Sequence, residues 1–267
     1  MAADAVCRMA RGPLIGGITM STCDPAAVRS PHPTQLLASV RSASEAQLVL
    51  AAGAQVVDAK EPRDGALGAL PLAVIADIVR AVEGRVPVSA TTGDLALDDP
   101  ELGPAALAVA LTGVDYVKIG IFGQPDAQAL QRCLQSLPSL PCAPGRRQPA
   151  RYIAVLMADQ GGIDWPLAAF SAAQFAGVML DTADKRCGGL RAIARDAALR
   201  DFVDRAHQAE LLVGLAGSLE ATDIPALCRL QPSYLGFRTA LCGAAGRTGD
   251  LDLIATRRLC TALLDAA

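Results

Sequence analysis

The repeated alternation of two kinds of segment constrains the fold of this chain more than any other feature. From residue 34, short runs of apolar and β-branched residues alternate with longer segments rich in alanine and leucine, and eight such units follow one another. Short, continuously apolar runs are typical of strands buried on both faces, and the longer segments suit helices that connect parallel strands. The predicted strands span residues 35–40, 55–59, 86–90, 116–121, 152–157, 177–180, 211–215 and 234–237.

The number of units and the chain length together predict the architecture. Eight units within 267 residues fit a single α/β domain, a (β/α)8 TIM barrel over residues 34–267, with residues 1–33 as a poorly ordered N-terminal leader. An open doubly wound sheet is the alternative, but no GxGxxG motif follows the first predicted strand. The predicted helices span residues 44–52, 70–82, 104–111, 126–137, 190–208 and 224–230.

Composition excludes several classes of function. A net charge of −3 and an aromatic content of 3% argue against nucleic acid as a partner. No stretch approaches the roughly 18 apolar residues that a membrane span requires. The eight cysteines are scattered, without a CxxC pair or a nearby histidine, so we expect reduced thiols, no metal site and no cofactor. The protein is expected to be cytoplasmic.

Lysine is rare in this chain: 21 of its 24 basic residues are arginine, and only Lys60, Lys118 and Lys185 are lysine. An amine can lose its proton and attack a carbonyl carbon, whereas a guanidinium stays charged. All three lysines lie at or just beyond the ends of predicted strands, and barrel enzymes build their active sites at the carboxyl ends of strands. The sequence therefore predicts chemistry by buried lysines on small phosphorylated carbonyl compounds. Three solvated or ion-paired lysines are the alternative.

Carboxylates and glycines accompany these lysines. Asp58 precedes Lys60 by two residues, so both side chains lie on the same face of a strand, and Asp181 precedes Lys185. Carboxylates in such positions shift lysine pKa values and carry protons. Barrels often bind phosphate at the loops after the seventh and eighth strands, and four residues there are candidates, with turn geometry alone as the alternative. These are Gly217, Ser218, Gly236 and Arg238.

Three further residues are candidates on the loops after the second and third predicted strands. Gly65 and Gly68 are expected to shape the loop after Lys60 and secondarily to contact phosphate. Asp94 is either a helix cap or a member of the site, and we favour the site because it shares the rim with the lysines.

Several segments resemble one known family. They are VVDAKEPRDGALGA at 56–69, VSATTGD at 88–94, DYVKIG at 115–120, MLDTADK at 179–185, LAGS at 215–218 and GFRTALC at 236–242. Together and in this order they closely resemble the (5-formylfuran-3-yl)methyl phosphate synthases of methanofuran biosynthesis. The resemblance covers roughly residues 35–265 and departs between Arg238 and Asp250, where the glycine and arginine spacing is looser.

The resemblance implies a homo-oligomeric lyase of class I aldolase type. Such an enzyme condenses two molecules of glyceraldehyde 3-phosphate to a furan, with loss of phosphate and water, in methanofuran-type cofactor biosynthesis and C1 metabolism. It further implies that Lys60 forms the Schiff base, that Lys118 accepts the proton, and that Asp181 and Lys185 assist proton transfer and hold the second substrate. Another class I aldolase and a non-catalytic phosphosugar-binding barrel remain alternatives.

Overall fold

The computed structural model describes residues 33–123, 126–184, 188–243 and 246–266. In these ranges eight parallel strands form one closed barrel, ordered β1 to β8 with β8 paired back to β1. The predicted TIM barrel is confirmed; the assignment of residues 1–33 to a leader stays a prediction. The strands are β1 Gln35–Val40, β2 Val56–Ala59, β3 Val88–Thr91, β4 Tyr116–Ile121, β5 Arg151–Met157, β6 Gly177–Asp181, β7 Leu212–Leu215 and β8 Tyr234–Phe237.

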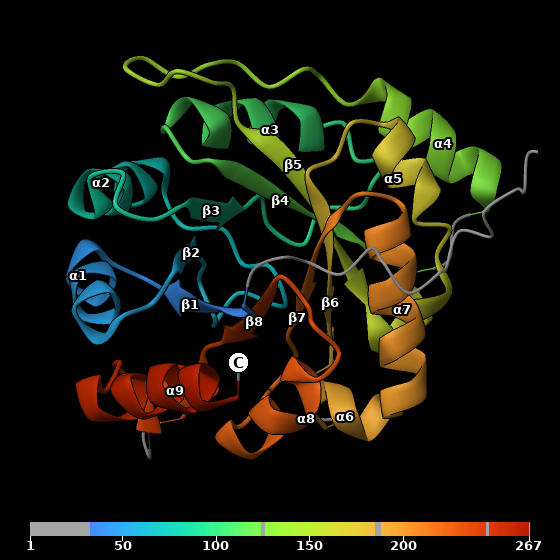
Figure 1. Cartoon of the computed structure of the whole chain (residues 1–267). Helices are drawn as coiled ribbons and strands as arrows, with labels where there is room; N and C mark the ends of the chain where they lie inside the picture. The colour runs from blue at the N-terminus through green and yellow to red at the C-terminus, as the bar shows by residue number, and fades with distance from the viewer. Residues whose placement is uncertain (1–32, 124–125, 185–187, 244–245, 267) are drawn as a thin grey trace, which may run out of the picture.

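Helices surround the barrel and cover its outer face (Figure 1). The last helix lies beside the first, so that the ring of helices closes as the ring of strands does. The α-helices of the described residues are α1 Ala43–Ala52, α2 Leu72–Val82, α3 Leu102–Leu111, α4 Ala127–Ser136, α5 Ala168–Ala172, α6 Leu190–Ile193, α7 Asp196–Gln208, α8 Ile224–Cys228 and α9 Leu253–Asp265. None of them is long and apolar enough to cross a membrane.

The prediction of one continuous helix over residues 190–208 was wrong. The segment 190–208 forms two helices, α6 and α7, because Ala194 and Arg195 adopt extended backbone between them. Arg191 on α6 donates to the carboxylate of Asp196, the first residue of α7, and so fastens the two helices across the break. Neither glycine nor proline lies at this break, so the local sequence carries no signal for it.

The barrel interior contains one group of apolar side chains and one group of polar and charged side chains. Apolar side chains fill much of the inside, including Leu37, Val56, Ile153, Val155, Met179 and Tyr234. Buried polar and charged side chains also project inward from the strands, namely Ser39, Asp58, Ser89, Lys118 and Asp181. Burying charges is costly unless they are paired and hydrogen-bonded. The contacts of this polar group therefore indicate where the chemistry of the protein lies.

Candidate active site

Asp58 is the centre of the buried polar group. The barrel register places Ser39 of β1 and Ser89 of β3 directly beside Asp58 of β2. Both hydroxyls donate to its carboxylate, Ser39 Oγ to Oδ2 at 3.1 Å and Ser89 Oγ to Oδ1 at 2.6 Å. Lys118 Nζ, from β4, donates to Oδ1 at 3.0 Å. The carboxylate therefore sits in a cage of donors that favours its charged form.

Burial and charge act in opposite directions on this pair. Burial by itself raises the pKa of Asp58, but the charges of Lys118 and Lys60 and the hydrogen bond from Ser89 outweigh it, so this pKa lies below its ordinary value. Burial lowers the pKa of Lys118 below its ordinary value; the carboxylate of Asp58 opposes that shift and the charge of Lys60 adds to it. Lys118 is thereby shifted toward the neutral amine that a proton acceptor must be.

A second lysine and carboxylate pair lies at the barrel mouth. Lys60 directly follows β2 and is buried, and its Nζ lies 3.4 Å from Oδ2 of Asp181, the last residue of β6. The other oxygen of Asp181 accepts the Thr182 N–H at 2.7 Å. Lys60, Lys118, Asp58 and Asp181 all line one pocket. Two amines in one pocket, each beside a carboxylate, are suited to attack on a carbonyl carbon and to proton transfer.

The position of Lys118 within its strand differs from the predicted one. Lys118 is the third residue of the six-residue strand β4, so it does not lie at a strand end as we predicted. It takes part in the site because its side chain projects into the barrel interior and is long enough to reach Asp58. The predicted site residue Lys185 lies outside the described residues.

The loops after β7 and β8 form one wall of the same pocket. The predicted phosphate-site residues Gly217, Ser218 and Arg238 line it from these loops and Gly236 lines it from within β8, although their contact with phosphate stays a prediction. Gly217 has a φ of 107°, and a Cβ there would meet Thr182 Cγ2 at 2.9 Å, so glycine is required. Within the described residues, the N–H groups of Gly217 and Ser218 donate to no protein acceptor. Such N–H groups can bind an anion.

Gly65, Gly68 and Asp94 build the loop that follows β2. The Asp94 carboxylate accepts the Ala66 N–H at 3.0 Å and the Leu67 N–H at 2.6 Å. Gly65 has a φ of 85°, and a Cβ at Gly68 would meet Glu61 O at 2.2 Å. In the structure these three residues therefore shape the loop, and their contact with substrate stays a prediction.

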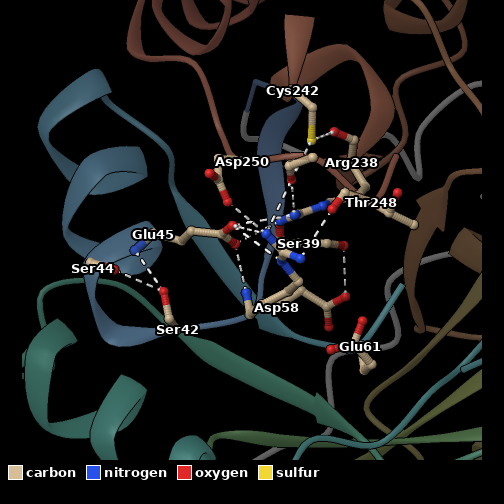
Figure 2. Close-up of polar contacts among 12 residues, drawn as sticks. Ser39, Ser42, Ser44, Glu45, Asp58, Glu61, Arg238, Cys242, Thr248 and Asp250 are labelled. Atoms are coloured by element: carbon tan, nitrogen blue, oxygen red, sulfur yellow. Dashed lines mark hydrogen bonds and ion pairs between the residues drawn. The ribbon is translucent and has the colours of Figure 1, made fainter. Parts of the chain in front are cut away.

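Arg238 is buried within a cluster of polar side chains and backbone carbonyls (Figure 2). Nη1 donates to Ser39 O at 3.0 Å and Glu45 Oε2 at 2.7 Å, and Nη2 donates to Glu45 Oε1 at 3.3 Å. Nη2 also donates to Gly249 O at 2.8 Å, and Nε donates to Arg247 O at 3.0 Å. All five guanidinium N–H groups are thus used within the protein. The prediction that Arg238 contacts phosphate remains untested, and this geometry leaves it no free donor.

The sequence reasoning missed four residues of this region. Ser39 and Ser89 were detectable as hydroxyl residues inside otherwise apolar strands. Glu45, which pairs with Arg238, and Arg247, which lines the pocket, carried no local signal. In the part of the chain that the structure describes, no group of three or more histidine, cysteine or acidic residues is arranged to hold a metal ion.

Fold and site together define a (β/α)8-barrel enzyme with two lysine and carboxylate pairs in one pocket. A family model described as 4-HFC-P synthase matches residues 36–259. The (5-formylfuran-3-yl)methyl phosphate synthase of Methanosarcina acetivorans is 34% identical over 220 residues, which cover 80% of this chain and 93% of the relative. The chain belongs to the family of the (5-formylfuran-3-yl)methyl phosphate synthases, which confirms the resemblance seen in the sequence.

Other relatives agree with this assignment. The synthase of Methanopyrus kandleri is 32% identical over 239 residues, 86% of this chain and 98% of the relative. A protein of Methylorubrum extorquens, whose name assigns the same activity provisionally, is 40% identical over 218 residues, 82% of this chain and 86% of the relative.

Solved structures of other barrel enzymes resemble the chain in fold. Phosphoribosyl anthranilate isomerase from Thermus thermophilus has a TM-score of 0.59 at 12% identity, with 88% of this chain and all (100%) of that chain covered. Thiamine phosphate pyrophosphorylase from Pyrococcus furiosus has a TM-score of 0.54 at 11% identity, with 87% and 96% covered. At these identities the likeness is one of fold alone.

Proposed function

We propose that this chain condenses two molecules of glyceraldehyde 3-phosphate to (5-formylfuran-3-yl)methyl phosphate through an imine on Lys60, as a Schiff-base lyase of methanofuran-type cofactor biosynthesis. Family membership supports the product. The observation that carries the mechanism is the placement of two buried amines, each beside a carboxylate, in one pocket at the barrel mouth. Homo-oligomeric assembly and a cytoplasmic location stay predictions.

Lys60 is the proposed nucleophile. Its amine lies at the pocket wall beside Asp181, which can take and return the protons that imine formation requires. The neutral amine adds to the substrate carbonyl carbon, and loss of water gives an iminium. The iminium then draws electrons from the adjacent carbon and acidifies its hydrogen.

Lys118 is the proposed acceptor of that hydrogen. Its lowered pKa favours the neutral amine, and after proton uptake the ammonium is stabilised by Asp58 at 3.0 Å. Removal of the proton leaves an enamine, which can attack the carbonyl carbon of the second substrate. Hydrogen bonds from Ser39 and Ser89 favour the charged form of Asp58. The charged Asp58 in turn stabilises Lys118 once Lys118 has accepted the proton.

The loops after β7 and β8 are the proposed phosphate side of the pocket. The N–H groups of Gly217 and Ser218, which donate to no acceptor among the described residues, are suited to phosphate oxygens. Gly236 lines the same pocket, and a Cβ there would meet Met179 Cε at 2.7 Å. Gly65, Gly68 and Asp94 are proposed to shape the loop after Lys60 and to contact substrate or its phosphate from there. Lys185 is proposed to hold that second substrate, on the resemblance alone.

Borohydride reduction in the presence of glyceraldehyde 3-phosphate tests the proposal. An imine on Lys60 leaves a stable adduct that peptide mass spectrometry locates at that residue. Formation of the furan product then separates this enzyme from another class I aldolase. A protein that binds glyceraldehyde 3-phosphate but gives neither adduct nor product would be a non-catalytic phosphosugar-binding barrel, and the proposal would be wrong.

A further inference from the structure

Arg247 differs from the other cationic side chains that line the pocket. Lys60 pairs with Asp181, Lys118 with Asp58 and Arg238 with Glu45. Within the described residues, no carboxylate lies within 4.0 Å of the Arg247 guanidinium, and its hydrogen bond is from Nη2 to Gly65 O at 2.8 Å. Among the described residues that line the pocket, Arg247 is therefore the cation whose charge no described carboxylate offsets at close range.

The position of Arg247 brings it over the pocket. The residue lies in the loop after β8, and its contact with Gly65 joins this loop to the loop after β2. Burial lowers the pKa of Arg247, while the charge of Asp181 opposes the shift, so the guanidinium is partly shielded from water and within electrostatic range of the site. It nevertheless stays charged, because arginine does not lose its proton in proteins.

A cluster of three side chains, Arg41, Glu45 and Arg238, holds the backbone of this loop. Arg238 donates to the carbonyl of Arg247 itself. Arg41 Nη1 donates to Thr248 O at 3.1 Å, and its Nη2 lies 2.9 Å from Asp250 Oδ1. The Glu45 carboxylate accepts from both guanidinium groups, and Figure 2 shows it pointing from α1 toward Arg238. Arg41 and Arg238 together make five hydrogen bonds to residues 247–250, which indicates that the placement of this loop matters.

We propose that Arg247 binds a phosphate group of the substrate through its guanidinium, and that Arg41, Glu45 and Arg238 are positioning residues that hold its loop over the pocket. The proposal rests on the proposed function for the identity of the phosphorylated substrate. A guanidinium offers paired N–H donors that match two phosphate oxygens. Gly217 and Ser218 line the same pocket and can supply backbone N–H groups to the same anion.

Direct binding of inorganic phosphate tests the assignment without any catalytic step. Titration calorimetry on the full chain compares the parent protein with Arg247→Gln and with the matched control Arg80→Gln, which removes the same charge from the last turn of α2. We expect Arg247→Gln to bind phosphate about tenfold to a hundredfold more weakly, as for loss of hydrogen bonds to a charged group. Equal affinity in the two variants would overturn the proposal.

Kinetics give a second measurement. For exchange of the substrate α-hydrogen with solvent deuterium, the ratio of kcat/KM for glyceraldehyde 3-phosphate to kcat/KM for glyceraldehyde should fall at least about tenfold in Arg247→Gln, mainly through KM, and Arg247→Lys should recover part of it. If the parent protein traps no imine on Lys60 but Arg247→Gln still binds phosphate more weakly than the parent, the proposed function is wrong and this inference stands. If the parent protein traps the imine but Arg247→Gln binds phosphate as tightly as the parent, the inference alone is wrong.

The positioning role is tested through a double-mutant cycle. Glu45→Gln retains an oxygen that can accept the Arg41 N–H, now accepted by Glu45 Oε2 at 2.7 Å, but removes the charge that both arginines share. If Glu45 acts through Arg247, Glu45→Gln should weaken phosphate binding in the parent protein and have no further effect in Arg247→Gln. Additive losses would show that Glu45 does not act through Arg247. A purely structural role of Glu45 would lower kcat/KM for α-hydrogen exchange equally for glyceraldehyde and glyceraldehyde 3-phosphate.

Discussion

Replacing Asp58 by asparagine should change the pH at which the enzyme loses activity on the acid side. The substitution keeps the size of the side chain and one of its two acceptor oxygens, and the hydroxyl beside the new amide nitrogen can accept from it, but the negative charge 3.0 Å from Lys118 Nζ is lost. That charge opposes the lowering of the Lys118 pKa by burial. Without it, the amine of Lys118 should lose its proton at a lower pH.

The magnitude follows from Coulomb's law. Unit charges 3.0 Å apart interact by about 1.4 kcal/mol at the dielectric constant of water and about 5.5 kcal/mol at an effective value of about 20. Lys118 is 2% exposed, so the larger figure is nearer to its surroundings. Since about 1.4 kcal/mol corresponds to tenfold, the ratio of neutral to charged Lys118 should rise at least tenfold at any given pH.

The assay is the pH dependence of exchange of the substrate α-hydrogen with solvent deuterium. Its acid limb should move to lower pH in Asp58→Asn whatever the absolute rate, because its position reports the ionisation of the proton acceptor. Lys60 and Asp181 also act electrostatically on Lys118. Borohydride trapping across the same pH range therefore measures imine formation on Lys60 separately from proton transfer to Lys118.

Ser39→Ala is the matched control. It removes the 3.1 Å hydrogen bond to Asp58 but leaves the carboxylate charged, so its acid limb should move much less. An acid limb of Asp58→Asn that stays in place, or moves to higher pH, would refute the assignment of Lys118 as the base. Urea unfolding of both variants checks that the fold persists.

Three further predictions follow from the same site. Lys60→Arg should retain the circular dichroism spectrum yet lose turnover, because a guanidinium cannot form the imine; turnover within a few-fold of the parent enzyme would contradict this. Lys118→Ala should still trap substrate on Lys60 under borohydride while α-hydrogen exchange falls about 100- to 10,000-fold, and a loss below tenfold would argue against the base role. Exhaustive chelation should leave activity unchanged; activity lost and then restored by one divalent ion would overturn this expectation.

Much of the fold was predictable from local pattern. The strands β1, β4 and β8 have the bounds predicted from their apolar runs. Four others differ by one residue at one end, and β3 differs by two residues at its start and one at its end. A strand covered on both faces is apolar at most of its positions, so consecutive apolar residues indicate it. The break between α6 and α7 was missed because the contact that accompanies it, between Arg191 and Asp196, is one of side chains.

The sequence by itself determined the number of βα units, and its scarcity of lysine pointed to Lys60 and Lys118 as candidates. Only the tertiary structure decided which groups meet. The register of three neighbouring strands brings Ser39 and Ser89 to the carboxylate of Asp58, and barrel closure brings Glu45 to Arg238, 193 positions later in the chain. Patterns of apolar residues are read from neighbours in the sequence, and they indicate which segments are buried. Hydrogen bonds and ion pairs between distant residues depend on distances that exist only after the barrel has closed.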